Sequence, residues 1–344
     1  RGVRGIASVG RWNETGLGYA SGVEVRGDRL FLNVPKRGQY VFDIGNPAAP
    51  VLLNSYVWDW NYLISGWNFG VSDDGSRLVV DAAWLRANLD EPNVVVLHVG
   101  QAYTEGHIPG AVPVDLGAIS VTTGDPDGPD YRRLELPADL DVARSVFEAA
   151  GVSSGSTVVA VFEGSGVANA TRAIWTLQVL GKDDVRLLVG GLDAWTAAGG
   201  PIASGDAPEV ERGVLDTPVR LDRRVDRDFV LAQGDAPGIA LLDGRRPQHF
   251  TGEREERPGR AGHIPGAASV PLLSLFTDDG RLRPADELRD LFAEAGVTEG
   301  DQVVTYCHIG FWASGVAFVA RTLGYDARLY LSLIHISEPT RPTT

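Results

Sequence analysis

The spacing of hydrophobic and polar residues changes along the chain, and these changes predict where strands and helices lie. Short apolar runs at 94–99 and 158–162 are typical of buried strands, and the mixed segment 139–150 is typical of an amphipathic helix. The same order recurs with an apolar run at 239–242, a helical segment at 285–295 and a strand at 303–306. Strands that alternate with helices predict parallel sheets, so we expect an α/β fold.

The chain contains an internal repeat. EGHIPGAVPVDL at 105–116 nearly matches AGHIPGAASVPL at 261–272, and AGVSSGSTVVAVFEGSG at 150–166 matches AGVTEGDQVVTYCHIGF at 295–311. Matching blocks in one order indicate two homologous domains, which we place at residues 77–205 and 206–330. The segment 199–218, rich in Gly, Pro and acidic residues, breaks both periodicities and predicts a linker.

The two ends of the chain follow neither repeat. Residues 1–75 alternate apolar and polar positions between Gly, Pro and Asn turns, which predicts a small β-rich segment that resembles one blade of a propeller-like repeat. The first domain continues after Leu188 into a Gly-containing turn and Trp195, whereas residues 331–344 read LSLIHISEPTRPTT. We interpret residues 331–344 as an aberrant tail from adapter or cloning DNA that replaces the final helix.

Charge and hydropathy exclude several partners. The chain has 31 Lys and Arg against 45 Asp and Glu, a formal net charge of −14, which argues against a nucleic-acid partner. No apolar run approaches the roughly 18 residues of a membrane span, and the first residues lack the apolar core of a signal peptide. We therefore expect a cytoplasmic protein, with the periplasm left open because a chain without Met leaves its true start undefined.

The single cysteine, Cys307, is the strongest candidate for chemistry. One cysteine excludes an internal disulfide and a cysteine-rich metal site. Cys307 lies between the strand at 303–306 and a helical pattern that begins at Trp312. Backbone N–H groups and the helix N-terminus at such a loop favour an anion, so we expect a lowered thiol pKa. The alternative is a buried, inert cysteine.

These blocks together resemble the rhodanese family of tandem sulfurtransferases over roughly residues 77–330. The likeness rests on both GHIPGA blocks, on Asp243-x-Arg245 after a strand, and on VVTYCHIGFWAS around Cys307. The resemblance implies two rhodanese-like domains with parallel sheets flanked by helices. It also implies that Cys307 takes a sulfane sulfur from a donor, holds it as a persulfide and passes it to a nucleophilic acceptor.

The resemblance also implies roles for other residues. Asp243 is expected to support the site, and Arg245 and His249 to bind the donor, with His249 standing where the family usually has an Arg. The active-site loop is expected to comprise Cys307 followed by His308, Ile309, Gly310, Phe311, Trp312, Ala313 and Ser314. The first domain is expected to be inactive, because Phe162 aligns with Cys307 and His98-Val99-Gly100 replaces the Asp-x-Arg element.

Two histidines that invite a catalytic interpretation are assigned a structural role instead. His107 and His263 occupy the same place in the repeated Gly-His-Ile-Pro-Gly turn, including the copy whose domain lacks a cysteine. We therefore expect both side chains to make structural hydrogen bonds.

The predicted activity is transfer of a sulfane sulfur from thiosulfate or 3-mercaptopyruvate to cyanide or a thiol, including that of a thioredoxin-like protein, with no cofactor or metal. Ala313 stands where related phosphatases need an Arg, which argues against phosphate-ester hydrolysis. The loop sequence CHIG at 307–310 matches neither donor's usual signature, so the donor stays open. The alternative function is a non-catalytic sulfur carrier or protein-interaction module with a degenerate domain pair.

Overall fold

The structure is a computed structural model of the chain, and it describes residues 22–26, 29–34, 38–43, 51–56, 78–123, 132–233, 236–254, 261–277 and 280–331. The chain divides into two compact units, Arg1–Asn68 and Phe69–Thr344. The larger unit contains both repeated domains.

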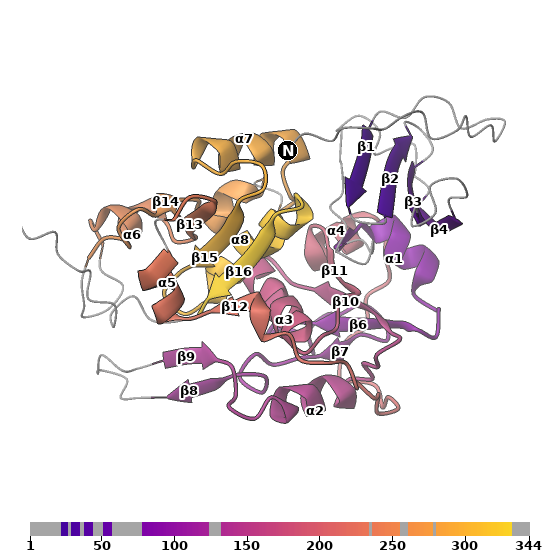
Figure 1. Cartoon of the computed structure of the whole chain (residues 1–344). Helices are drawn as coiled ribbons and strands as arrows, with labels where there is room; N and C mark the ends of the chain where they lie inside the picture. The colour runs from indigo at the N-terminus through magenta and orange to yellow at the C-terminus, as the bar shows by residue number, and fades with distance from the viewer. Residues whose placement is uncertain are drawn as a thin grey trace, which may run out of the picture. The chain divides into compact units, whose positions relative to one another are not determined.

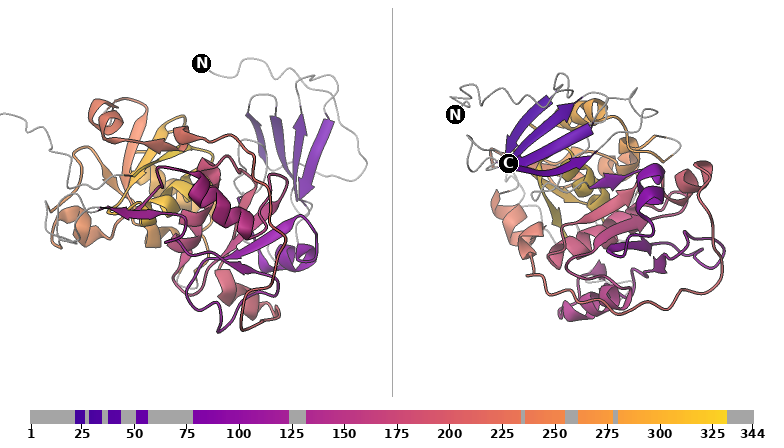
Figure 2. Two further views of the ribbon diagram at one scale, coloured as in Figure 1. Left: turned by 90° about the horizontal axis from the view of Figure 1, so that it is seen from below. Right: turned by 90° about the vertical axis from the view of Figure 1, so that its right-hand side faces the viewer.

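The smaller unit contains a four-stranded antiparallel sheet, seen face-on in Figure 2. Its strands are β1 (Gly22–Arg26), β2 (Arg29–Val34), β3 (Gly38–Asp43) and β4 (Val51–Tyr56), and they pair in chain order. The prediction of antiparallel strands within residues 1–75 is confirmed for these ranges. A meander of four strands is also the topology of one propeller blade.

Each repeated domain contains a five-stranded parallel sheet, and the two sheets have the same strand order (Figure 1). The first sheet runs β5 (Val79–Val80), β11 (Val185–Leu188), β10 (Thr157–Val161), β6 (Val94–His98) and β7 (Val112–Pro113). The second runs β12 (Arg224–Val225), β16 (Asp326–Tyr330), β15 (Gln302–Tyr306), β13 (Ile239–Asp243) and β14 (Ala268–Ser269). The predicted tandem α/β fold is confirmed.

The register of the central strands fixes the correspondence between the domains. In the first sheet Val161 pairs with His98, and in the second Tyr306 pairs with Asp243. The residue after each central strand therefore occupies the same place, which is Cys307 in the second domain. Because parallel strands end at one edge of the sheet, the segments after β13 and β15 meet there.

Helices flank both sheets. The first domain has α1 (Ala82–Asn88), α2 (Asp141–Ala149), α3 (Val167–Val179) and α4 (Gly191–Ala197), and a hairpin of β8 (Val121–Thr123) with β9 (Arg132–Glu135). The second has the short 3₁₀ segments η2 (Leu221–Arg223) and η3 (Leu272–Leu275), and α5 (Arg227–Gln233), α6 (Pro247–Thr251), α7 (Ala285–Glu294) and α8 (Phe311–Thr322). The helices predicted at 139–150 and 285–295 are confirmed, with ends that differ by at most two residues.

Helices α3 and α8 are buried on nearly every side, and each follows the central strand of its own domain. They pack against each other, so the two domains meet along this helix pair. A helix that is apolar all round requires such complete cover, and the sequence of α8, FWASGVAFVART, supplies small and apolar residues at most positions. The site after β15 therefore lies against the first domain.

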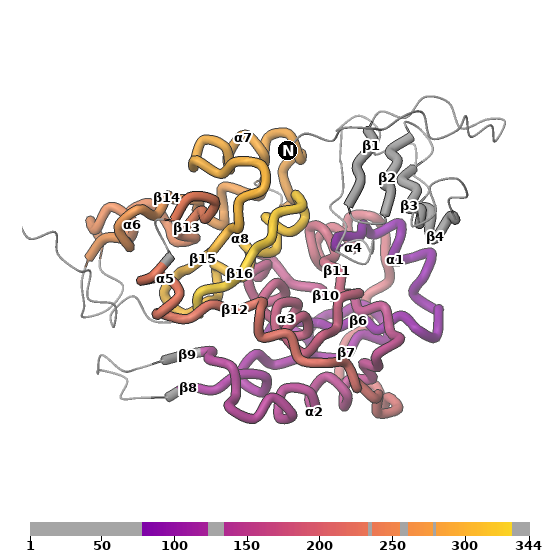
Figure 3. The backbone as a smooth tube through the Cα atoms, viewed as in Figure 1, coloured from indigo at the N-terminus to yellow at the C-terminus, as the bar shows by residue number. Residues whose placement is uncertain are grey.

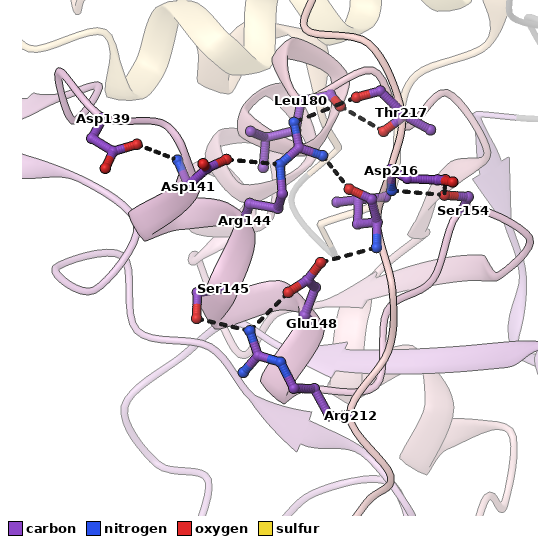
Figure 4. A network of polar contacts seen from close by, with 11 residues as sticks. Asp139, Asp141, Arg144, Ser145, Glu148, Ser154, Leu180, Arg212, Asp216 and Thr217 are labelled. Carbon is purple, nitrogen blue, oxygen red and sulfur yellow. Dashed lines mark hydrogen bonds and ion pairs between the residues drawn. The ribbon is translucent and has the colours of Figure 1, made fainter.

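The linker is irregular in structure, as predicted, and hydrogen bonds connect it to α2. Figure 3 follows residues 199–220 from α4 toward β12 without a helix or named strand. Arg212 donates to Ser145 at 2.9 Å and to Glu148 at 2.7 Å, and Glu148 in turn accepts from the Leu215 backbone N–H at 3.0 Å (Figure 4). These bonds hold the linker along the first domain.

The described part of the second domain ends at Leu331, directly after β16. In the first domain α4 follows the corresponding strand β11. Apart from Leu331, the predicted aberrant tail lies outside the described residues. None of the helices in the described ranges is long and apolar enough to cross a bilayer.

Candidate functional site

The loop that carries Cys307 is a tight connection from β15 to α8. Cys307 follows Tyr306, the last residue of β15, and α8 begins only four residues later at Phe311. The chain makes this turn through Gly310, which adopts a left-handed conformation with φ of 71°. This conformation favours glycine, and a side chain here would also crowd the end of the Leu331 side chain.

The start of α8 surrounds the sulfur of Cys307 with backbone donors. The N–H groups of Ile309, Trp312 and Ala313 hydrogen-bond to Sγ of Cys307. Thr305 holds the same turn from the strand side by donating from Oγ1 to the Ala313 carbonyl at 2.9 Å. The sulfur therefore faces a preformed ring of donors, which suits negative charge on the thiolate or on a sulfur bound to it.

The resting thiol is nevertheless not acidic. Cys307 is only 3% exposed, and this burial raises the pKa of its thiol. The backbone N–H groups lower the pKa and the charge of Asp243 raises it further, so burial prevails. The prediction of a lowered thiol pKa is therefore wrong. It counted the amides and the helix N-terminus but not the loss of water around the sulfur.

Asp243 and Arg245 form a closed pair at the end of β13. Asp243 is fully buried, and Arg245 donates to its carboxylate from the backbone N–H and Nε at 3.0 Å and from Nη2 at 2.6 Å. Arg245 Nη2 also donates to the Gly262 carbonyl at 2.7 Å. The pair therefore ties the strand end to the second GHIPGA turn, an arrangement that supports the loop.

His249 lies close to this pair in sequence, on α6 directly after β13. Its side chain is buried, and Nδ1 is 3.1 Å from the Arg254 carbonyl oxygen. His308, in the active-site loop itself, is partly buried.

The two turn histidines have matching surroundings. His107 stacks on Tyr103 with ring centroids 3.9 Å apart, and His263 stacks on Phe250 at 3.7 Å. In both cases Nδ1 lies 2.8 Å from the carbonyl oxygen of the same aromatic residue. Since one copy lies in the domain without a cysteine, this geometry supports the structural role.

A pocket of about 410 Å³ borders the loop. Its lining combines segments of the first domain with two residues of the active-site loop: Asp115, Leu116, Gly117, Ser120, Thr122, Leu134, Asn169, Ile309 and Phe311. A larger pocket of about 710 Å³ is lined by the first domain and the linker and contains none of residues 307–314. Of these two pockets, the smaller one borders the active-site loop.

Sequence reasoning missed two arginines near the loop. The Arg246 guanidinium lies 5.4 Å from the centre of a Trp312 ring. Arg172 reaches the loop from α3 of the first domain, where it lies beside Gly310. A signal for Arg172 exists, because it is the only charged residue in the α3 sequence VANATRAIWTLQV. The expectation that the first domain is inactive assigns no site residue to α3.

Comparison with known proteins gives concordant matches. The family model for the rhodanese-like domain matches residues 81–198 and 226–332. SseB of Mycobacterium tuberculosis, whose name provisionally assigns it as a thiosulfate sulfurtransferase, is 35% identical over 269 residues, covering 77% of this chain and 89% of SseB. The sulfur carrier protein TtuD of Thermus thermophilus is 33% identical over 265 residues, covering 72% and 89%.

A solved structure shows the same fold. SseA from Escherichia coli, described as a 3-mercaptopyruvate sulfotransferase with the rhodanese fold, superposes with a TM-score of 0.64 at 28% identity. The match covers 76% of this chain and 99% of SseA.

Proposed function

This chain belongs to the rhodanese-like family and is a sulfurtransferase, and we propose that it moves a sulfane sulfur from thiosulfate or 3-mercaptopyruvate through a persulfide on Cys307 to a thiophilic acceptor. The observation that carries the proposal is the ring of N–H groups around Sγ of Cys307 at the β15–α8 junction. This ring can hold a negative charge on the outer sulfur of a persulfide without a metal or organic cofactor.

The proposed cycle has two substitution steps at sulfur. The Cys307 thiolate attacks the outer sulfur of thiosulfate, and a new S–S bond forms as the S–S bond of the donor breaks. Sulfite leaves with the electron pair of the broken bond, and the persulfide keeps one negative charge. With 3-mercaptopyruvate the C–S bond breaks instead, and the enolate of pyruvate leaves and takes up a proton.

In the second step the acceptor attacks the terminal sulfur of the persulfide. Cyanide forms thiocyanate and returns the Cys307 thiolate, and a thiol, including that of a thioredoxin-like protein, forms its own persulfide. No electron donor or oxidant is consumed, because the sulfane sulfur passes between nucleophiles. Cys307 is the only cysteine of the sequence, so no internal thiol can resolve the persulfide.

The surrounding residues have separate parts in this proposal. Asp243 and Arg245 hold the loop through their mutual bonds and the bond to Gly262, so Arg245 acts on the donor through the loop that it supports. We assign His249, on α6 after β13, to binding of the donor.

A second function, sulfur carriage without independent turnover, is favoured by the burial of Cys307 and by the similarity to TtuD, which is named a sulfur carrier protein. In that case a persulfide forms on Cys307, but only a partner protein discharges it. Turnover with a small acceptor distinguishes the two functions.

The test combines intact mass with a turnover assay. Incubation with either donor should add the mass of one sulfur to the protein, and cyanide should remove it as thiocyanate. The variant Cys307→Ser should form no adduct and lose at least about 10³-fold of the turnover, because no other side chain supplies the nucleophile. Sustained turnover in Cys307→Ser would overturn the proposal, and an adduct that cyanide does not discharge would favour the carrier.

A further inference from the structure

Arg172 is a buried charge with incomplete hydrogen bonding. It lies on α3 of the first domain and is only 1% exposed. Nη2 donates to the Leu134 carbonyl, and the guanidinium carbon lies 4.7 Å from the centre of a Trp175 ring. Nε and Nη1 are buried without a hydrogen-bond acceptor within the described part of the chain. Leaving such donors unsatisfied is costly unless an anion meets them at some stage.

The guanidinium is aimed at the loop of the second domain. Nη1 lies 2.9 Å from the point where a Cβ on Gly310 would sit, three residues after Cys307. The helices that carry these groups are in contact, with Thr171 Oγ1 on α3 lying 3.3 Å from Ser314 Oγ on α8. Cys307 and Trp175 also belong to one buried apolar cluster. Arg172 and Cys307 are 1% and 3% exposed, and the low polarity of such buried surroundings strengthens the attraction between opposite charges.

Two anions act on Arg172, Glu135 and the thiolate of Cys307. Burial lowers the pKa of Arg172 to about 10, and the charges of Glu135 and the Cys307 thiolate oppose that fall while Arg224 adds to it. Asp243 acts on Cys307 in the opposite sense and disfavours the thiolate. Arg172 stays protonated at neutral pH, so the site holds a permanent positive charge although His249 stands where the family usually has an Arg.

We propose that Arg172, contributed by the domain that lacks a cysteine, is a positioning residue that stabilises negative charge on the sulfur of Cys307. The role rests on the proposed function, in which that sulfur is charged both as thiolate and as persulfide. It gives the first domain a part in the chemistry of the second.

The experiment measures alkylation of Cys307 by iodoacetamide against pH in full-length protein, which needs no sulfur transfer. Arg172→Met removes the charge but keeps an apolar chain of similar length. The inflection should move up by about one pH unit, equivalent to about tenfold less thiolate at a fixed pH below it. Arg172→Lys should restore most of this shift. The inflection is the readout, since altered packing changes access to the sulfur at all pH values alike.

Arg186→Met is the matched control. Arg186 is also a buried arginine of the first domain, 7% exposed, and its guanidinium also lies 4.7 Å from a tryptophan ring, that of Trp84. It pairs with Asp184 rather than reaching the Cys307 loop. The control should leave the inflection unchanged.

An inflection in Arg172→Met equal to that of the wild type, or an equal shift in Arg186→Met, would overturn the proposal. Should Arg172→Met fail to show a cooperative urea transition, Arg172→Gln carries the same expectation, because it keeps a donor for Leu134. A shifted inflection without a persulfide adduct would refute the sulfur-transfer function and leave the role of Arg172 standing. An adduct with an unshifted inflection would do the reverse.

Discussion

The two domains have the same sheet topology and differ in the residues that follow the central strand. Both sheets have the same order, and both turn histidines stack on an aromatic ring in the same way. After β15 the second domain places Cys307 and His308, whereas after β10 the first places Phe162 and Glu163. The sheet order and the turn histidines are therefore kept with or without the cysteine, whereas the residues at this edge of the sheet differ.

The first domain fills this edge with its own carboxylate. Glu163 Oε1 accepts from the backbone N–H groups of Gln101 and Ala102 at 2.7 and 2.9 Å, and Oε2 lies 3.3 Å from Nε2 of His98. His98 occupies the strand position that Asp243 has in the second domain. The first domain thus closes this edge with contacts of Glu163 to two other segments. In the second domain the pair at the strand end is Asp243 with Arg245, and the next loop carries Cys307.

The largest expected difference between the domains is the free energy of unfolding that is lost when each of these two pairs is broken. Arg245→Met leaves the fully buried Asp243 carboxylate without its guanidinium, which should cost about 3–5 kcal/mol in the free energy of unfolding. Glu163→Gln should cost only about 1 kcal/mol, because the side chain of Glu163 is 27% exposed and an amide oxygen can still accept from Gln101 and Ala102. Urea unfolding of both variants measures the difference.

Equal losses in these two variants would show that the edges of the two domains are energetically alike. Arg245→Met together with Asp243→Leu is the control, since replacing both partners with apolar residues should recover much of the loss.

The pH dependence of stability should distinguish the first domain further. Burial lowers the pKa of His98 below its usual 6.5, although the charge and hydrogen bond of Glu163 oppose the shift. The unfolded chain therefore binds more protons than the folded chain in that range. Stability is complete above about pH 6.5 and is lost as pH falls through the lower, folded-state value.

Glu163 adds a second pH-dependent contribution to the stability, and this one is lost at lower pH. Burial alone would raise the pKa of Glu163, but the N–H groups of Ala102 and Gln101 and the charge of His98 together lower it. The contribution of Glu163 to stability is present above its ordinary pKa and is lost as pH falls through the folded-state pKa.

Urea transitions at pH 7.5 and 5.5 test the His98 contribution, and His98→Gln should reduce the difference in stability between these two pH values. A wild-type stability that is equal at the two pH values, or higher at pH 5.5 than at pH 7.5, would contradict the assignment.

Patterns of residues close together in the chain predicted the fold and the position of Cys307. They did not predict the direction of the thiol pKa shift or the place of Arg172. The repeated blocks and the alternation of strands with helices predicted both parallel sheets, and the position of Cys307 at a strand-to-helix turn predicted the ring of N–H donors. These features depend on residues close together in the chain. The thiol pKa and the part of Arg172 depend instead on how α3 packs against α8, which no spacing within either segment reveals. The contacts of the Glu163 carboxylate also depend on the pairing of β6 with β10, which the sequence around Glu163 does not show.

The smallest expected effect concerns the pocket beside the loop, to which the first domain contributes a negative charge. Asp115 lines the pocket together with Ile309 and Phe311, and its Oδ1 accepts from the Gly117 N–H at 3.0 Å. Asp115→Asn keeps an acceptor and removes the charge that repels a dianionic donor. Because Asp115 is exposed and water screens it, KM for thiosulfate should fall only about two- to threefold at low ionic strength.

The effect of Asp115→Asn should shrink toward nothing in about 0.5 M salt, where screening acts within a few ångströms. Asp193→Asn is the matched control, since it changes the net charge equally from an exposed position on α4 that does not line the pocket. Steady-state kinetics of the three proteins at two salt concentrations isolates the local charge. If Asp115→Asn and Asp193→Asn lower KM equally, the donor responds to net charge alone, and its route to Cys307 does not pass the carboxylate of Asp115.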